Sequence, residues 1–203
     1  MKNLTPVSFT NVEIKDNFWS ERLLVNREKT LKANYKHLKK QGRIDAWTWK
    51  KGQPNKPHIF WDSDVAKWIE AVSYHLANKR NKSLEKKVDH VVEIMAEAQL
   101  DNGYLNSYFI NVEPDRKWTN LRNEHELYCA GHLIEAAVAY YDATGKNKFL
   151  KIMSKYADLI NKIFGPNRNQ TKGYPGHQEI ELALIKLYRA TKNKKYLELS
   201  KFF

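Results

Sequence analysis

The sequence is poor in the residues that mark several common classes of protein. It contains one cysteine in 203 residues, which excludes an internal disulfide framework. Glycine and proline number 8 and 6, too few for a collagenous or low-complexity chain. No stretch approaches the roughly eighteen uninterrupted apolar residues that a membrane-spanning helix requires. We therefore expect one globular domain, or part of one, with no membrane as a partner.

The N-terminus also lacks the apolar stretch of a secretory signal. Residues 1–17 contain Pro6, Asn11, Glu13 and Asp16 where that stretch would lie. We therefore predict a cytoplasmic protein. A mature exported form would tolerate a single cysteine equally well and stays open.

Acidic residues are fewer than basic ones. The chain has 35 lysines and arginines against 23 acidic residues, for a formal net charge of +12. Such an excess raises nucleic acid as a partner. The lysines, however, occur in small groups near turns and predicted helix ends, and neither zinc-finger spacing nor an RNP-like aromatic strand is present. We predict a solvated, lysine-rich surface and no nucleic-acid partner.

Residues 1–60 are predicted to form an N-terminal segment. Apolar and polar side chains alternate over residues 7–14, which indicates extended backbone. From Asn17 the apolar spacing lengthens to that of a helix carrying Leu23, Leu24 and Leu31. Residues 41–60 then read as a long loop with glycines, prolines and tryptophans, and loops of this kind are often functional.

Residues 61–203 are predicted to contain three helical hairpins. The segments 77–84, 143–150 and 190–197 each run from alanine through a polar, basic turn to leucine, with helical periodicity on both sides. Their uneven spacing argues against a repeat array of fixed period. The additional length lies in the connections 101–123 and 165–176, as in an α/α toroid with a site at one mouth.

The predicted fold is therefore all-α: an incomplete (α/α)6 toroid of about three αα-hairpins after a short extended N-terminal segment. Residues 196–203 stop inside a helical pattern without a capping residue. We expect a chain truncated at its C-terminus, occupying residues 1–203 as the N-terminal half of a barrel. The helix faces left open could then support association with another surface.

The densest polar cluster spans residues 118–132. If a helix begins near Asn123, then His125, Cys129 and His132 share one face and could ligate zinc. Alternatively, Cys129 fills the core and His132 is a hydrogen-bonded packing residue, which we favour, so we predict no metal ligands. We expect His125 to project at the helix mouth, where a substrate would lie.

A second cluster spans residues 173–181. Gly and Pro shape a turn, after which His177 or Gln178 opens a helix. A simple helix start would explain this pattern, but a histidine at the openings of two successive hairpins also indicates a binding site.

Two further candidates open or precede hairpins. Asp62 is most simply a helix N-cap. Tyr104 follows a turn and could stack on a sugar, although a turn alone also explains it. Aromatic and neutral hydrogen-bonding groups along one edge suit carbohydrate better than phosphate, and the sequence has no phosphate-binding loop, nucleophile elbow or dinucleotide fingerprint.

The motifs at 60–71, 101–105, 125–132 and 176–181 together resemble the β-L-arabinofuranosidase family, glycoside hydrolase family 127. The resemblance runs in order from about Val12 to the last residue. It implies an (α/α)6 barrel followed by β-sandwich domains, and hydrolysis of terminal β-L-arabinofuranose from plant-derived glycans with retention. It also implies that His125 and His177 hydrogen-bond the arabinose ring.

The resemblance does not extend to the family's catalytic groups. Members use a zinc-held cysteine nucleophile with further cysteines and a glutamate, and a second glutamate as acid/base, all in the later half of the barrel. Cys129 does not match the nucleophile, and retaining chemistry needs two groups flanking the bond. We therefore expect no catalytic residue and no zinc in this chain, with an arabinose-containing oligosaccharide as its partner and His125 and His177 as binding residues.

Two other functions stay open from the residues alone. Another α/α-toroid carbohydrate enzyme, such as an unsaturated glucuronyl hydrolase or a sugar epimerase, would act on an acidic substrate or need no zinc. A non-catalytic helical binding protein that uses the positive charge would bind more weakly as salt increases.

Overall fold

The computed structural model describes residues 4–203, so the first three residues of the predicted N-terminal segment, Met1 to Asn3, lie outside the described residues. The principal helices are α1 (Trp19–Val25), α2 (Leu31–Lys40), α3 (Trp61–Asn78), α4 (Lys82–Ala98), α5 (Ser107–Asn111), α6 (Glu126–Thr144), α7 (Lys148–Ile163), α8 (Ile180–Thr191) and α9 (Lys194–Phe202). Within residues 4–203 no strand forms, and only an isolated bridge joins Phe164 to Thr171. The all-α prediction is confirmed.

The N-terminal segment is extended but unpaired. Its backbone is extended at Ser8 and Val12, on either side of a 3-10 turn at Phe9–Asn11. A π-helical turn, Asn26–Thr30, then joins α1 to α2. The strand-like alternation therefore corresponds to extended backbone that crosses the helices and forms no sheet.

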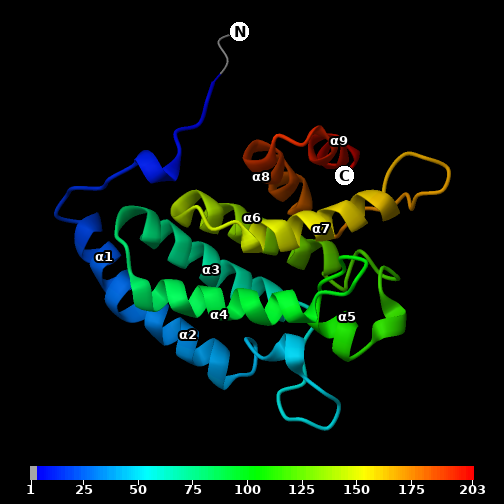
Figure 1. The fold of residues 1–203 in the computed structure, drawn as a ribbon, viewed down its shortest axis with the longest axis horizontal. Helices are drawn as coiled ribbons and strands as arrows, with labels where there is room; N and C mark the ends of the chain where they lie inside the picture. The colour runs from blue at the N-terminus through cyan, green and yellow to red at the C-terminus, as the bar shows by residue number, and fades with distance from the viewer. Residues whose placement is uncertain (1–3) are drawn as a thin grey trace.

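The three predicted hairpins are α3–α4, α6–α7 and α8–α9. Helix α6 lies between α3 and α8 in one row, while α4, α7 and α9 form a second row outside it (Figure 1). Their short turns use local capping: Asn81 accepts hydrogen bonds from the first backbone N–H groups of α4, and Asn193 does the same for α9. Helix α6 ends at Gly145, whose φ of 74° suits a residue without a side chain.

The core fills the space between the two rows. Its fully buried side chains include Val65, Ile69, Val72, Val88, Val91, Leu133, Ile134, Met153, Tyr156, Ile160, Ala183, Leu184 and Leu187. Because each helix buries an apolar stripe against two or three neighbours, the hairpins fix one another's positions.

The long connections gather at one end of this helical array. In Figure 1 the loops before α3, before α6 and before α8 lie toward the right, whereas the tight turns of the first two hairpins lie toward the left. The arrangement is that of a partial α/α toroid, as predicted. Among the described residues, no helix combines the length and apolar character needed to cross a membrane.

Candidate functional site

The starts of α6 and α8 bring two predicted binding residues, His125 and His177, together. Helix α6 begins at Glu126, and not near Asn123 as the sequence predicted. His125 is the N-cap and lies in the left-handed region, with φ of 59°, so the right-handed helix does not extend back through it. The ring centroids of His125 and His177 lie 5.1 Å apart.

The two imidazoles are in hydrogen-bonding contact. The Nδ1 atom of His125 lies 2.7 Å from the carbonyl oxygen of Asn123, which can only accept, so Nδ1 carries the proton. In a neutral ring, Nε2 then has a free lone pair. His177 Nε2 lies 3.2 Å from it and donates. This assignment leaves His177 Nδ1 as an acceptor at the exposed edge.

Aromatic rings surround this pair. The ring centroid of Tyr128 lies 5.6 Å from that of His125 and 5.0 Å from that of His177. Phe60 lies 6.1 Å from His125, and Lys67 Nζ donates to the Tyr128 hydroxyl at 2.8 Å. We call Phe60, His125, Tyr128 and His177 the histidine cluster. It combines ring faces with donors and acceptors, as a sugar site requires.

The sequence analysis did not single out Tyr128 within the cluster 118–132. Tyr128 follows His125 by three residues, but this spacing places two side chains on one face only within a helix, and His125 precedes α6. The sequence paired His125 with Cys129 and His132 instead.

The structure separates His125, Cys129 and His132, which the sequence placed on one face. Cys129 is buried, its thiol donates to the Ile59 carbonyl oxygen at 3.4 Å, and burial raises its pKa well above the usual value. His132 instead packs edge-on against Tyr128, with centroids 4.5 Å apart. The predicted shared face is wrong because α6 starts after His125. His125 therefore does not follow the helical spacing that relates Cys129 to His132. Cys129 is the core residue predicted by the alternative interpretation.

Asp62 is not the N-cap that the sequence predicted. The N-cap position of α3 is Phe60, and no side chain caps it. Asp62 is 1% exposed, and its Oδ2 atom accepts the backbone N–H of Ser107 at 2.8 Å. Burial raises the pKa of Asp62 to about 6, against the opposing effect of this hydrogen bond. The carboxylate therefore anchors the connection after α4 to the start of α3.

Tyr104 is also an anchor in this structure. Its ring is 1% exposed and packs edge-on against Trp118 and Tyr156, so it presents no face to a sugar. Its hydroxyl donates to Glu126, whose other oxygen accepts the backbone N–H of Trp118 at 2.6 Å. Burial raises the pKa of Glu126 to about 7. These bonds fix the start of α6 and hence the turn carrying His125.

Gln178, the remaining candidate, is exposed next to His177 in the chain. Of the predicted binding residues, the structure thus brings His125 and His177 into contact at an accessible edge and buries Asp62 and Tyr104.

Beneath the histidine cluster lies a group that could hold a metal ion. His132, Glu135 and Glu179 have ligand atoms within 4.8 Å of one another, and we call them the carboxyl cluster. Burial lowers the pKa of His132 to about 4, which leaves a neutral imidazole at pH 7. These donors do not fit a multi-cysteine zinc site, because the sole cysteine of the sequence faces Ile59.

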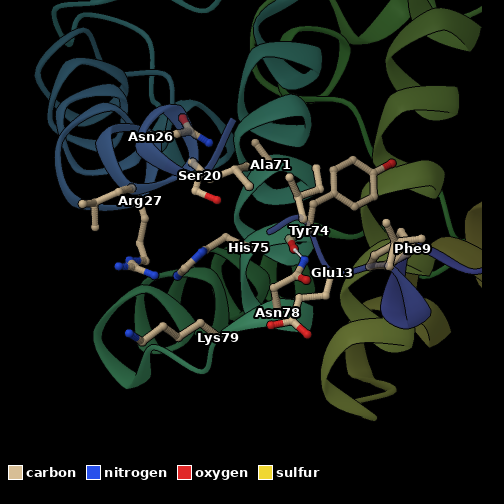
Figure 2. Close-up of a pocket in the computed structure, with 14 residues that line it drawn as sticks. Phe9, Glu13, Ser20, Asn26, Arg27, Ala71, Tyr74, His75, Asn78 and Lys79 are labelled. Atoms are coloured by element: carbon tan, nitrogen blue, oxygen red, sulfur yellow. Dashed lines mark hydrogen bonds between the residues drawn. The ribbon is translucent and has the colours of Figure 1, made fainter. Parts of the chain in front are cut away.

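An apolar cavity of about 720 Å³ lies toward the other end of α3, under the N-terminal segment and α1 (Figure 2). Its apolar lining residues are Phe9, Val12, Ile14, Leu23, Leu24, Ala71 and Tyr74. Figure 2 shows Arg27, His75 and Lys79 together at one side of it. The cavity is larger than a monosaccharide needs, and its polar groups lie beside a wall of aliphatic and aromatic side chains.

Comparisons with known proteins identify the family of the chain. The chain matches the family profile "Beta-L-arabinofuranosidase, GH127 catalytic domain" over residues 11–203. It is 42% identical over 148 residues to a non-reducing end β-L-arabinofuranosidase from Bifidobacterium longum subsp. longum, covering 71% of this chain and 22% of that enzyme.

Solved structures give the same result. A β-L-arabinofuranosidase of this family from Geobacillus stearothermophilus T6 is 48% identical with a TM-score of 0.90, covering 95% of this chain and 32% of that one. A second β-arabinofuranosidase of the family is 41% identical with a TM-score of 0.89, over 98% of this chain and 33% of that one. The chain thus spans less than half of each relative. Because the profile match covers most of the sequence, the chain belongs to glycoside hydrolase family 127, the β-L-arabinofuranosidase family.

Proposed function

We propose that this chain forms the sugar-binding part of a retaining β-L-arabinofuranosidase site, with His125 and His177 hydrogen-bonding a terminal arabinofuranose of a plant-type oligosaccharide. The observation that carries this proposal is the contact between the two imidazoles at an accessible edge. The assignment above leaves His177 Nδ1 free as an acceptor, so a ring hydroxyl of the sugar can donate to it.

The surrounding groups favour a neutral sugar. Phe60 and Tyr128 offer ring faces for the apolar side of a furanose, and Gln178 can reach a second hydroxyl. Membership of glycoside hydrolase family 127 supports this proposal over the glucuronyl hydrolase and epimerase alternatives. The family match does not favour the nucleic-acid alternative, and part of the basic surface is paired with acidic side chains, as Lys146 is with Glu85 and Asp89.

The proposal assigns the 203 residues to binding and not to bond cleavage. The thiol of Cys129 is buried, its pKa is raised by burial, and it is hydrogen-bonded to a backbone carbonyl, so it is a poor nucleophile. A nucleophile, an acid/base glutamate and zinc would have to come from residues other than these. We therefore propose no bond cleavage by these residues alone.

Titration of the 203-residue chain with methyl β-L-arabinofuranoside, followed by NMR, tests the proposal. We expect the His125 and His177 resonances to shift with the sugar, and His177→Ala to weaken binding about tenfold, as for the loss of one or two hydrogen bonds. His90→Ala, an exposed histidine on α4, is the matched control and should bind normally. Equal affinity for methyl β-D-glucopyranoside, or wild-type binding by His177→Ala, would contradict the proposal.

A further inference from the structure

The segment that carries His177 is held at two points where the chain approaches glycine closely. Immediately before His177, Gly176 packs so tightly on the carbonyl oxygen of Arg122 that any added Cβ atom would collide with it. Two residues after His177, Glu179 packs against Gly131 of α6, where an added Cβ atom would lie 2.6 Å from the Glu179 Cγ atom. His177 therefore lies between two fixed contacts.

The second contact is also a polar one. The Oε1 atom of Glu179 lies 3.2 Å from His132 Nδ1, and its carboxyl group lies beside that of Glu135, with ligand atoms within 4.8 Å of one another. Lys186 donates to Glu135 from the opposite side and lies 3.7 Å from Glu70 of α3. The start of α8 is thus tied to α6 through side chains that water reaches poorly.

The two carboxyl groups are in different protonation states at neutral pH. Burial, together with the neighbouring Glu135 carboxyl, raises the pKa of Glu179 to about 8. Burial opposes ionisation of Glu135, but hydrogen bonds from Glu179 and Lys186 keep its pKa below the usual value. Glu179 is therefore the protonated partner, and its O–H group donates to the Glu135 carboxylate.

Lys186 favours this proton-sharing arrangement over a metal ion. The ammonium group of Lys186 already binds Glu135, and it repels a divalent cation placed among His132, Glu135 and Glu179. Binding of Zn²⁺ by the wild-type chain would show that the carboxyl cluster holds a metal instead.

We propose that Glu179 is a positioning residue: packed against Gly131 and beside His132, it fixes His177 against His125 in the geometry that binds sugar. This inference rests on the proposed function for the role of the histidine pair. The link to the histidine cluster is physical, because His132 contacts Tyr128 and Tyr128 contacts His177, with ring centroids 4.5 and 5.0 Å apart.

The test combines two variants of Glu179 with NMR of the imidazole nitrogens in the 203-residue chain. Glu179→Ala should change the resonances of the paired histidines and reduce affinity for methyl β-L-arabinofuranoside about tenfold. Glu179→Gln should stay within about twofold of wild type, because its amide N–H can donate to Glu135 as the protonated carboxyl does. Glu198→Ala, which removes an exposed carboxylate from α9, is the matched control.

Gly131→Ala provides a second route to the same displacement. Alanine suits the helix backbone better than glycine, so this variant should fold, yet its Cβ atom pushes Glu179 away. We expect it to alter the histidine resonances as Glu179→Ala does, which keeps the inference testable if the latter variant does not fold.

Three outcomes separate the explanations. Unchanged histidine resonances in both Glu179→Ala and Gly131→Ala would overturn the inference. A Glu179→Gln variant as impaired as Glu179→Ala, with Zn²⁺ binding to the wild type alone, would overturn proton sharing in favour of a metal. Altered histidine resonances in a chain that binds no sugar even as wild type would support positioning by Glu179 and remove the proposed function instead.

Discussion

At its start, helix α3 lies under a shallow edge rich in polar and aromatic groups, whereas toward its end it borders a large apolar cavity. Tyr74 and His75, which line the cavity, follow Asp62 by about twelve to thirteen residues, or roughly 20 Å of helix. Two imidazoles are in hydrogen-bonding contact in the histidine cluster, whereas aliphatic and aromatic side chains make up half of the residues that line the cavity. The two ends of α3 therefore offer different chemistry to a ligand.

The buried supports of the two ends differ in the same way. Beneath the histidine cluster, Asp62 and Glu126 accept backbone N–H groups and bind connections to helix starts. Near the cavity, Leu23 and Leu24 are about half exposed, and their side chains have no polar group that could bind a neighbouring loop. We therefore expect mutations near the histidine cluster to cost more stability than equivalent mutations at the cavity.

The largest effect is expected for Glu126→Ala. The substitution leaves the buried Tyr104 hydroxyl and the Trp118 N–H without their acceptor. We expect a loss of about 2–5 kcal/mol in the free energy of unfolding, measured by urea denaturation. A loss below about 1 kcal/mol would show that the turn before α6 is held by packing alone, and the contrast between the two ends would weaken.

An intermediate effect, dependent on pH, is expected for Asp62→Asn. Because the folded pKa of Asp62 is raised from 3.8 to about 6, the native state binds more protons than the unfolded state between these values. Ionisation of Asp62 therefore destabilises the fold as pH rises through that window, and the penalty is complete above about 6. We therefore compare the free energy of unfolding of Asp62→Asn with that of wild type. The difference should favour the variant by about 1–3 kcal/mol more at pH 8 than at pH 4.

His75, at the cavity end of the same helix, provides a control of opposite sign. Burial lowers its pKa, with the charge of Arg27 adding to the effect, so the folded state binds fewer protons and stability falls as the pH is lowered through the usual histidine range. The free energy of unfolding of His75→Gln should therefore be higher than that of wild type at pH 5 but not at pH 8. If both variants responded to pH in the same direction, the electrostatic distinction between the two ends would be wrong.

The smallest effect is expected for Leu24→Ala at the cavity wall. Leu24 is 47% exposed, so truncation removes little buried area and should cost below about 1 kcal/mol. It should also leave binding of methyl β-L-arabinofuranoside unchanged in the NMR titration. A tenfold loss of sugar affinity would instead make the cavity part of the binding site.

The sequence predicted the hairpins well because their signals are local. The turns at Asn81, Gly145 and Asn193 lie between regions of strong helical periodicity, and each side of a turn buries its apolar stripe in the core. The sequence also predicted that His125 and His177 stand at helix openings; His125 directly precedes α6, but α8 begins three residues after His177, at Ile180. Their mutual contact could not be read from it, because 52 residues separate them in the chain.

The wrong predictions concern helix starts. Asn123 and Asp62 have side chains that favour an N-cap, yet α6 begins after His125 and α3 begins at Trp61. In both places tertiary partners outweigh the local preference. The carboxyl of Asp62 accepts the backbone N–H of Ser107, and Glu126 accepts hydrogen bonds from the Tyr104 hydroxyl and the Trp118 N–H. A local capping rule does not include partners that arrive from another loop.

The sequence by itself determined the class of fold, the positions of the hairpins and the family, because periodicity, turn residues and ordered motifs are properties of short segments. Tertiary structure alone decided which groups meet: His125 with His177, Glu179 with Gly131, and Asp62 with Ser107. These contacts depend on how three long connections pack at one end of the helices. Burial, which sets the protonation of Asp62, Glu126 and Glu179, arises only once that packing has excluded water.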